Sequence, residues 1–302
     1  MTDQFRVLIL GHGEMGQAME YLLSERQHLD IWEKYPQDDF QSVVIEDAAS
    51  QADIVLFCLP VNPHREIAES IAPLLKQTCL CLSIAKGLDE TGQTAAQIFA
   101  EVFASYQPYA LLYGPMISEE IRAGRYAFAQ LGCVNLDSYK KIRELYHGTR
   151  LYIEHTPDII GISWSVILKN VYAMVFGMAD ELNLGDNMRG YLSVAALREL
   201  DQIVSVMGGQ AGSPYHLAGL GDLITTATSE DSHHHELGRK LARGETGGIE
   251  GEGVHTLDMV SQHHLLNDNE AEYLLFQLIH DIVRAPHDVE QRITAYLKQV
   301  YY

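Results

Sequence analysis

The 302-residue sequence is short of positive charge. It has 21 lysines and arginines against 41 aspartates and glutamates, which gives a net charge of −20. Such a charge repels phosphate backbones and anionic lipid surfaces, so we expect neither nucleic acid nor an anionic membrane as a partner. The same field repels an anionic substrate, so a site for one needs a local cluster of hydrogen-bond donors.

Cysteine is also scarce. The four cysteines (Cys58, Cys79, Cys81 and Cys133) lie in apolar stretches without C-x-x-C spacing, which argues against the common zinc and redox motifs. We expect buried free thiols in a reducing compartment, and therefore a cytoplasmic protein. No basic segment followed by an apolar run opens the chain, so no signal peptide is expected. The sequence leaves the oligomeric state open, a homodimer included.

One long apolar run is present. Gly161–Leu184 contains no proline and predicts a helix that is buried on several faces. Lys169 and Asn170 lie in its middle and acidic residues stand near its end, so we do not expect it to insert into a membrane. A buried lysine needs a carboxylate, a ligand or a lowered pKa. Lys169 is therefore a structural ion-pair partner, a lysine that reaches the surface, or a catalytic lysine with Asn170 beside it.

The chain begins with a strand–turn–helix pattern. Phe5–Leu10 predicts a buried strand, and a helical pattern runs to about Ser24. Between them stands the motif G-x-G-x-x-G, made of Gly11, His12, Gly13, Glu14, Met15 and Gly16. In such a motif the first glycine permits a tight turn, the second lets a pyrophosphate approach the backbone, and the third lets the helix pack on the strand. We expect a dinucleotide site, with a turn that binds no ligand as the alternative.

An acidic residue stands where such sites hold a ribose. Leu29–Trp32 predicts the second strand, and Glu33 follows it about twenty residues after the glycines, where it would bond the 2′-hydroxyl. An acid there repels a 2′-phosphate, which favours NAD over NADP. Lys34 is adjacent and keeps NADP open, and a solvated loop carboxylate is the alternative for Glu33.

Strands and helices then alternate. Strands are predicted at Asp53–Leu59, Cys79–Ala85, Ala110–Tyr113, Tyr126–Val134 and Leu151–Glu154, and helices at Gln93–Ala104, Ser138–Tyr146 and after Pro63, which Asn62 would cap. The alternation predicts an α/β fold, a Rossmann-type doubly wound parallel sheet, in residues 1–157. Pro60, Lys86 and Gly114 stand at strand ends, where such sheets bind ligands. The alternative for Lys86 is a surface lysine.

After Pro157 the patterns become helical. Helices are predicted at Gly161–Leu184, Met188–Met207, Leu257–Gln262 and Glu270–Val283. Residues 158–302 therefore predict an all-helical domain for substrate binding and catalysis.

Several motifs in this helical half agree with one another. They are Leu168–Ala173 (LKNVYA), Gly185–Asn187 (GDN), Leu217–Leu223 (LAGLGDL), Thr226–Ser229 (TATS) and Glu252–Val254 (EGV). Together with GHGEMG, AKG at Lys86 and GP at Gly114, the sequence resembles the NAD(P)-dependent glycerol-3-phosphate dehydrogenase family over nearly its whole length. The resemblance implies reversible hydride transfer between NAD(P)H and dihydroxyacetone phosphate or sn-glycerol 3-phosphate, in carbohydrate and glycerophospholipid metabolism.

The resemblance also implies roles for individual side chains. Lys169 would donate a proton to the carbonyl oxygen, Lys86 would polarise that oxygen, and Asp222 would orient the two lysines. Glu252 would lie near the nicotinamide end of the cofactor. An aspartate before a helical pattern can also be a helix cap, which is the alternative for Asp222.

The phosphate-binding motif departs from the family. Asn170 and Thr226 match phosphate donors, but His233 and His234 stand where the family has arginine and asparagine. An arginine carries a permanent charge, whereas a histidine is charged only below roughly pH 6.5. Three interpretations stay open: histidines that serve the phosphate, a dehydrogenase of an unphosphorylated hydroxy acid or polyol, and a dinucleotide-binding sensor without turnover. We expect His233–His235 to lie in a loop, where adjacent histidines rarely converge on one ion, so no metal site is expected.

Overall fold

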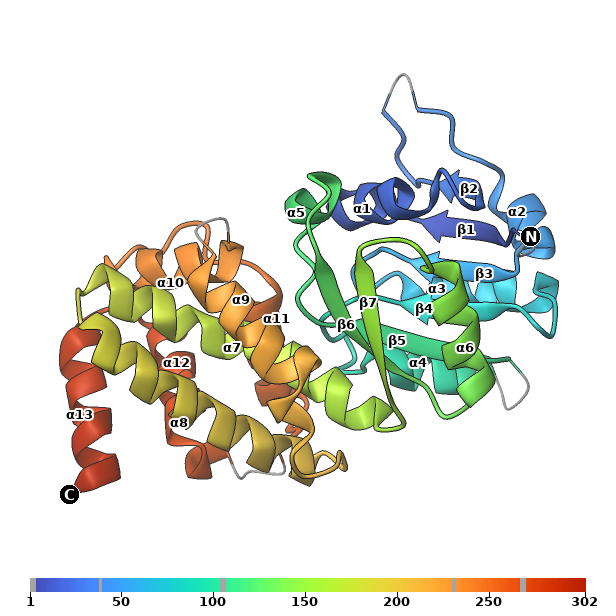
Figure 1. Ribbon diagram of the computed structural model, residues 1–302. Coiled ribbons are helices and arrows are strands. Elements are labelled where there is room, and N and C mark those ends of the chain that lie inside the picture. The colour runs from blue at the N-terminus through green and yellow to red at the C-terminus, as the bar shows by residue number, and fades with distance from the viewer. Residues whose placement is uncertain (1–3, 38–39, 104–106, 230–231, 267–269) are drawn as a thin grey trace. The chain divides into compact units, whose positions relative to one another are not determined.

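The chain forms two compact units. The computed structural model describes residues 4–37, 40–103, 107–229, 232–266 and 270–302. The first unit is Met1–Asp89 with Gln93–Ile159, and the second is Glu90–Gly92 with Ile160–Tyr302 (Figure 1). The three residues Glu90–Gly92 belong with the helical unit because His263 packs on Gly92 and its ring Nε2 lies 3.1 Å from the carbonyl oxygen of Glu90.

The first unit is built on a sheet. Within the described residues the strands form one seven-stranded sheet of order β2-β1-β3-β4-β5-β6-β7. The strands are β1 (Arg6–Leu10), β2 (His28–Trp32), β3 (Ile54–Phe57), β4 (Leu80–Ser83), β5 (Tyr109–Tyr113), β6 (Ala127–Gly132) and β7 (Leu151–Thr156). All neighbours pair in parallel except β5 and β6.

The antiparallel pair differs from the wholly parallel sheet that the alternation predicts. The connection from β5 to β6 contains only α5 (Ser118–Arg122), which is five residues long. Such a helix rises about 7.5 Å, which is less than the length of a five-residue strand at about 16 Å. The connection therefore does not carry the chain back along the sheet, and β6 returns beside β5 in the opposite direction.

Helices cover both faces of the sheet, which explains why strands such as β3 are wholly apolar. One core cluster joins the sheet to α1, α5 and α6, and another joins it to α2, α3 and α4. The helices not yet given bounds are α1 (Glu14–Leu23), α2 (Ile45–Gln51), α3 (His64–Ile71), α4 (Ala95–Val102) and α6 (Leu136–Leu145), with a 3-10 turn η1 (Ala72–Leu74). The doubly wound architecture that the sequence predicts is confirmed.

Two helix starts in this unit differ from expectation. The α4 helix begins at Ala95 because Thr94 and Gln97 form a reciprocal capping box. Ala104, the predicted end, lies outside the described residues. The predicted cap at Asn62 is wrong: α3 begins after Pro63 without a side-chain cap, and the His64 N–H closes the preceding turn on the Val61 carbonyl at 2.9 Å.

The second unit is helical. Its helices are α7 (Ile159–Glu181), α8 (Gly185–Val206), α9 (Asp222–Thr228), α10 (His233–Ala242), α11 (Glu252–Gln262), α12 (Leu274–Arg284) and α13 (Val289–Tyr301), with short turns η2 (Ser213–Tyr215), η3 (Leu217–Gly221) and η4 (Glu270–Glu272). The predicted helix Leu257–Gln262 is the second half of α11. The sequence analysis predicts no helix at α9, α10 or α13; α9 has only seven residues, and α10 opens with three histidines.

Helix α7 is the core of this unit. It is long and apolar enough to cross a membrane, but 89% of its most apolar window is buried inside the structure, as is usual for the core helix of a soluble protein. Gly177 of α7 and Gly238 of α10 let these helices touch. A Cβ at Gly177 would overlap the His235 carbonyl, and a Cβ at Gly238 would overlap the Met174 carbonyl. The two glycines thus let the backbones of α7 and α10 come into contact where the helices cross.

Candidate functional site

Each glycine of the turn Gly11–Gly16, here called the dinucleotide turn, has its own structural reason. Gly11 has a φ of +92°, and a Cβ there would lie 2.8 Å from the Cys58 carbonyl oxygen. A Cβ at Gly16 would overlap the Gly11 carbonyl, whereas a Cβ at Gly13 would have no atom within 4 Å. The fold itself therefore requires the first and third glycines, and the second faces open space where an anion can approach the backbone.

The first turn of α1 carries an acid whose charge is balanced. Gly13 is the N-cap and no side chain caps the helix, so its first N–H groups and its dipole favour an anion. Glu14 would oppose a pyrophosphate, but Arg122 of α5 lies 2.5 Å from its carboxylate and Ser118 Oγ donates to it at 3.2 Å. Sequence reasoning missed Arg122 and Ser118, because they come from a helix about a hundred residues away. Met15 packs against the core below the turn.

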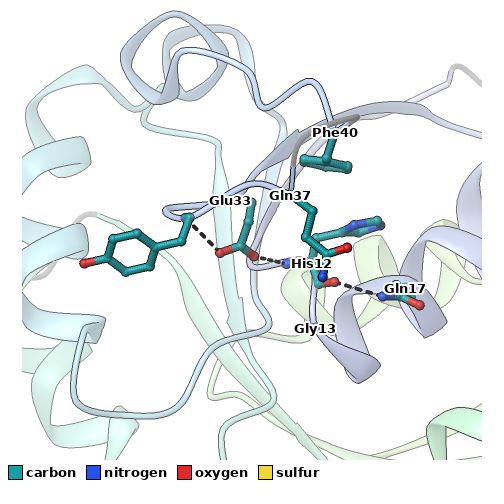
Figure 2. Close-up of a pocket in the computed structure, with 7 residues that line it drawn as sticks. His12, Gly13, Gln17, Glu33, Gln37 and Phe40 are labelled. Atoms are coloured by element: carbon teal, nitrogen blue, oxygen red, sulfur yellow. Dashed lines mark hydrogen bonds between the residues drawn. The ribbon is translucent and has the colours of Figure 1, made fainter.

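A pocket of about 990 Å³ opens beside the dinucleotide turn (Figure 2). Its volume suits a nucleotide-sized ligand. The His12 ring stacks on Phe40 with centroids 4.5 Å apart, and Gln17 Nε2 donates to the His12 carbonyl at 3.2 Å. The pocket is lined by His12, Gly13, Gln17, Glu33, Tyr35, Gln37 and Phe40.

Glu33 is bound to the dinucleotide turn. Its Oε2 accepts the His12 N–H at 2.8 Å and its Oε1 accepts the Tyr35 N–H at 3.3 Å, while its own N–H donates to Ser42 Oγ at 2.8 Å. A carboxylate has about four lone-pair sites, so these two bonds leave capacity for a ribose hydroxyl. The structure therefore holds the Glu33 carboxylate at the pocket wall.

A buried histidine joins the loops that follow β3 and β4. The Pro60 carbonyl can only accept, so His64 Nδ1 carries the proton and donates to it at 2.9 Å; Nε2 then accepts from Ser83 Oγ at 2.8 Å. Ser83 Oγ in turn accepts the Ala85 N–H at 3.1 Å. Burial lowers the pKa of His64 to about 4, in keeping with a neutral ring. This chain of bonds fixes the two loops that carry Pro60 and Lys86.

Lys86 lies near the end of β5. Its Nζ is 3.4 Å from the Gly114 carbonyl oxygen, to which it donates. Gly114 has a φ of +152°, and a Cβ there would lie 2.5 Å from the Phe128 carbonyl oxygen, so the fold requires glycine. The first unit therefore brings together Lys86 and Gly114, two residues that the sequence placed at strand ends.

The second unit contains a buried group of Lys169, Asp222 and Thr226, here called the lysine cluster. Lys169 and Asp222 are 5% and 3% exposed, and Nζ lies 3.3 Å from Asp222 Oδ2. Lys169 Nζ also donates to Thr226 Oγ1 at 2.6 Å, and that hydroxyl donates to the Asp222 carbonyl at 2.8 Å. A buried ion pair stabilises a fold little, so the presence of one here favours a chemical role.

Local structure directs Asp222 to the lysine. Asp222 is the first residue of α9, after the π-helical turn η3, and the N-cap is Gly221 without a side-chain cap. The helix-cap alternative for Asp222 is therefore wrong. Within η3, a Cβ at Gly219 would overlap the Pro214 carbonyl, which explains a glycine in this motif.

The start of α11 lies on α7 beside the lysine cluster. A Cβ at Gly253 would lie 2.7 Å from the carbonyl oxygen of Asn170, a residue only 2% exposed. Glu252 is the first residue of α11. Burial raises the pKa of the Glu252 carboxyl, and the charge of nearby His255 opposes that rise. The structure thus brings Glu252 and Asn170 to neighbouring helices of this unit.

The histidines lie in the first turn of α10, where the sequence suggested a loop. Ser232 is the N-cap and accepts the His235 N–H at 3.3 Å. His233 Nε2 donates to the Glu250 carbonyl at 2.8 Å, and His234 Nε2 accepts the Gly253 N–H at 3.3 Å. Both rings therefore contact the segment that leads into α11.

Sequence reasoning also missed Glu199. Its carboxylate accepts the Leu275 and Phe276 N–H groups at 2.7 and 2.9 Å and the Tyr172 hydroxyl at 3.0 Å. It therefore serves the open N-terminus of α12 and joins it to α7. The sequence did contain a signal for it: Glu199 is an acidic residue at a position where the helical spacing of Leu192–Ile203 in α8 predicts an apolar one.

The fold and these two sites define a class of protein. A doubly wound sheet with a glycine turn after β1 and an acid after β2 binds dinucleotides, and a buried lysine beside a carboxylate is a proton-transfer group of the kind that dehydrogenases use. Residues 33–138 match the family model for the N-terminus of NAD-dependent glycerol-3-phosphate dehydrogenase, and residues 158–294 match the model for its C-terminus. The chain belongs to the NAD-dependent glycerol-3-phosphate dehydrogenase family.

Individual relatives agree. The chain is 27% identical to an NAD(P)+ glycerol-3-phosphate dehydrogenase of Nitratidesulfovibrio vulgaris, over 95% of this chain and 97% of the relative. It is 33% identical to the NAD(P)+ glycerol-3-phosphate dehydrogenase of Mycobacterium avium, over 66% of this chain and 58% of the relative. The solved glycerol-3-phosphate dehydrogenase of Coxiella burnetii superposes with a TM-score of 0.84 at 25% identity, over 97% of this chain and 99% of that one. These likenesses confirm the family, the fold class and the NAD(P) cofactor.

Proposed function

We propose that this chain catalyses reversible hydride transfer between NAD(P)H and dihydroxyacetone phosphate or sn-glycerol 3-phosphate. The observation that carries the proposal is the lysine cluster, in which Lys169 lies 3.3 Å from Asp222 and both are almost wholly buried. The family supports it, because the relatives are named for this activity. The free thiols of the described cysteines are compatible with a cytoplasmic enzyme.

In this proposal the chain supplies the proton and holds the substrate. Bound NADH would supply the hydride to the carbonyl carbon. Lys169 Nζ would give a proton to the carbonyl oxygen and take it back in the reverse direction, with Asp222 holding the ammonium in place. Lys86 is proposed as the second lysine, which polarises that oxygen.

The substrate phosphate needs donors in a strongly acidic chain. We assign Asn170, Thr226, His233 and His234 to it, with Gly114 at the end of β5 near the reacting group. The Thr226 hydroxyl accepts from Lys169 and donates to the Asp222 carbonyl, so in this proposal it would turn from that carbonyl to donate to the phosphate. Glu252 is assigned to the nicotinamide end of the cofactor.

The cofactor assignment rests on the dinucleotide turn and Glu33. The open space at Gly13 and the uncapped α1 N-terminus suit a pyrophosphate. Glu33 favours NADH, because its carboxylate would repel a 2′-phosphate. Glu33→Gln keeps an oxygen for the His12 N–H but removes the charge, so the preference for NADH over NADPH should shrink. A wild-type enzyme that prefers NADPH would contradict this assignment.

The deciding experiment is NADH oxidation by the purified protein. Dihydroxyacetone phosphate is compared with dihydroxyacetone and a panel of 2-keto acids. Turnover with the phosphate ester alone is the expected result. Turnover with unphosphorylated substrates alone would favour a second function, dehydrogenation of a hydroxy acid or polyol. One observation favours this second function: His233 Nε2 already donates to the Glu250 carbonyl, and His234 Nε2 already accepts the Gly253 N–H.

A third result would overturn both functions. Tight NADH binding without any turnover would favour a dinucleotide sensor. The buried lysine cluster argues against that outcome, because binding alone does not need a buried proton donor.

A further inference from the structure

The first unit contains a second cavity, which the proposed dehydrogenase function does not use. Its volume is about 480 Å³. Three segments meet there: the end of α1, the turn after α5 and the residues before β7, which are labelled in Figure 1. The dinucleotide turn lies at the opposite end of α1, a helix of ten residues that is about 15 Å long. Each of the three segments contributes an arginine, namely Arg26, Arg125 and Arg150.

The charge of this cavity is opposite to that of the chain. The chain carries a net charge of −20, yet Glu25 is the one acid among the described residues that line the cavity. Arg125 pairs with Glu120 at 2.9 Å. Across the part of the chain that the structure describes, neither Arg26 nor Arg150 has a carboxylate oxygen within 4.0 Å. The cavity therefore holds two guanidinium charges that the protein does not neutralise.

Both guanidinium groups belong to exposed arginines, and their contacts are with neutral groups. Arg150 donates from NH1 to the Gly124 carbonyl at 2.5 Å, and its guanidinium carbon lies 5.2 Å from the centre of the Tyr126 ring. The Arg26 guanidinium lies against Gly148, 3.0 Å from where a Cβ would stand. Gly148 also has a φ of +79°, so both its backbone conformation and the nearby guanidinium favour glycine here. The bond to Gly124 orients the Arg150 guanidinium, and none of these contacts neutralises either charge.

These features indicate the chemistry of a ligand. Guanidinium groups match the geometry of phosphate oxygens, with two parallel hydrogen bonds from each group. The Tyr21 side chain also lines the cavity and is 51% exposed, so its ring can cover the less polar part of a ligand. The volume fits a small organic molecule. We propose that this arginine pocket is a second anion site, which binds a small phosphate ester separately from the dinucleotide turn.

The test is a binding titration with inorganic pyrophosphate as the probe. The full chain is first saturated with NADH, which occupies the dinucleotide turn, and pyrophosphate binding is followed by calorimetry. We expect saturable binding that the Arg26→Gln, Arg150→Gln double variant weakens at least about tenfold, because each lost charged hydrogen bond changes affinity by such a factor.

A matched control variant separates the site from net charge. Arg143→Gln, Arg198→Gln removes the same two charges from exposed arginines that form no ion pair within the described residues. This control should bind pyrophosphate as tightly as the wild type. Equal affinity in all three proteins, equal weakening in both variants, or no binding by the wild type would each overturn the proposal.

A second measurement needs no variant. Phenylglyoxal modifies accessible arginines, and mass spectrometry locates the modified residues. In the NADH-saturated protein, pyrophosphate should protect Arg26 and Arg150 but leave the modification of Arg143 unchanged. Unchanged labelling of all three arginines would overturn the proposal even if the double variant failed to fold.

Discussion

The dinucleotide turn and the lysine cluster are built in opposite ways. The turn consists of backbone: Gly11 and Gly16 bring chain segments within contact, and Gly13 leaves a space. The lysine cluster consists of side chains from two helices, and its contact between Lys169 and Thr226 joins residues 57 positions apart. The dinucleotide turn depends on residues without side chains, so a substitution that adds a Cβ should reduce its stability or its cofactor binding. The lysine cluster depends on buried polar side chains, so a substitution that truncates one of them should reduce catalysis.

The largest expected effect is the removal of the lysine. Lys169→Ala should lower turnover by about 10²–10⁴-fold, the usual contribution of a general acid. NADH binding should be unchanged, because the proposed cofactor turn belongs to the other unit. Steady-state kinetics and a fluorescence titration of NADH measure the two quantities.

The control for that variant is Lys298→Ala, which removes an exposed lysine of α13. It should leave both quantities unchanged. If Lys169→Ala lost NADH binding in proportion to activity, Lys169 would be a structural residue of α7, and the contrast between the two sites would not hold.

The same contrast explains what the sequence could predict. Each glycine of the turn acts on neighbours that the local strand–turn–helix pattern already places, so spacing alone indicated the site. No local pattern links Lys169 to Asp222 or Thr226; the family resemblance implied the meeting with Asp222, and nothing in the sequence predicted the bond to Thr226. The Glu33 contact with the His12 N–H and the Arg122 contact with Glu14 were also unpredictable, because side chains from separate elements form them.

Two expectations from the sequence were wrong: the wholly parallel sheet and the loop at His233–His235. The antiparallel β6 depends on the short α5, whose five residues gave no periodic signal. The three histidines that open α10 predict a loop, but Ser232 caps a helix there and Gly238 packs it against α7. The first error follows from the length of a local connection, and the second from a local cap together with a packing contact on α7.

The next effect tests whether glycine is required in the helical unit as well. Gly177→Ala places a Cβ on the His235 carbonyl where α7 meets α10, so unfolding free energy should fall by about 1–3 kcal/mol or more, as in overpacked cores. Gly190→Ala is the matched control: it lies in α8 with no atom within 4 Å of the added Cβ, and should stabilise by about 0.5–1 kcal/mol. Urea denaturation measures the unfolding free energy of both variants. Equal changes would show that the contact between α7 and α10 does not require glycine at position 177.

A paired substitution in the dinucleotide turn sharpens the comparison further. Gly16→Ala would overlap the Gly11 carbonyl and should destabilise the protein by about 1–3 kcal/mol. Gly13→Ala has open space around the added Cβ, so the melting temperature should stay the same while the NADH dissociation constant rises at least about tenfold, a cost of about 1.4 kcal/mol. Unchanged NADH binding in Gly13→Ala would mean that the cofactor does not approach this glycine.

The smallest effect separates a structural ion network from the lysine cluster on the same helix. Asp180, near the end of α7, accepts from Arg189 Nε at 2.6 Å and from His235 Nε2 at 2.7 Å. Burial raises the pKa of Asp180, but these two bonds outweigh it, so its pKa lies below the ordinary value of 3.8. The charged form is thus favoured by folding, and its contribution is present above about pH 4 and is lost as pH falls through the lowered pKa.

Asp180→Asn should therefore cost about 1–2 kcal/mol of unfolding free energy at pH 7, the scale of a charged hydrogen bond, and less as pH falls below about 4. Asp186→Asn is the control, because Asp186 pairs with the same Arg189 at 3.5 Å but its side chain is 97% exposed, so it should change stability by less than about 0.5 kcal/mol. Urea denaturation of both variants from pH 7 to pH 3.5 gives the comparison. A cost for Asp180→Asn that stays constant over this range would show that shape rather than charge matters there. Turnover at pH 7 should be unchanged, because Asp180 has no place in the proposed proton transfer, and this is what distinguishes it from Lys169 on the same helix.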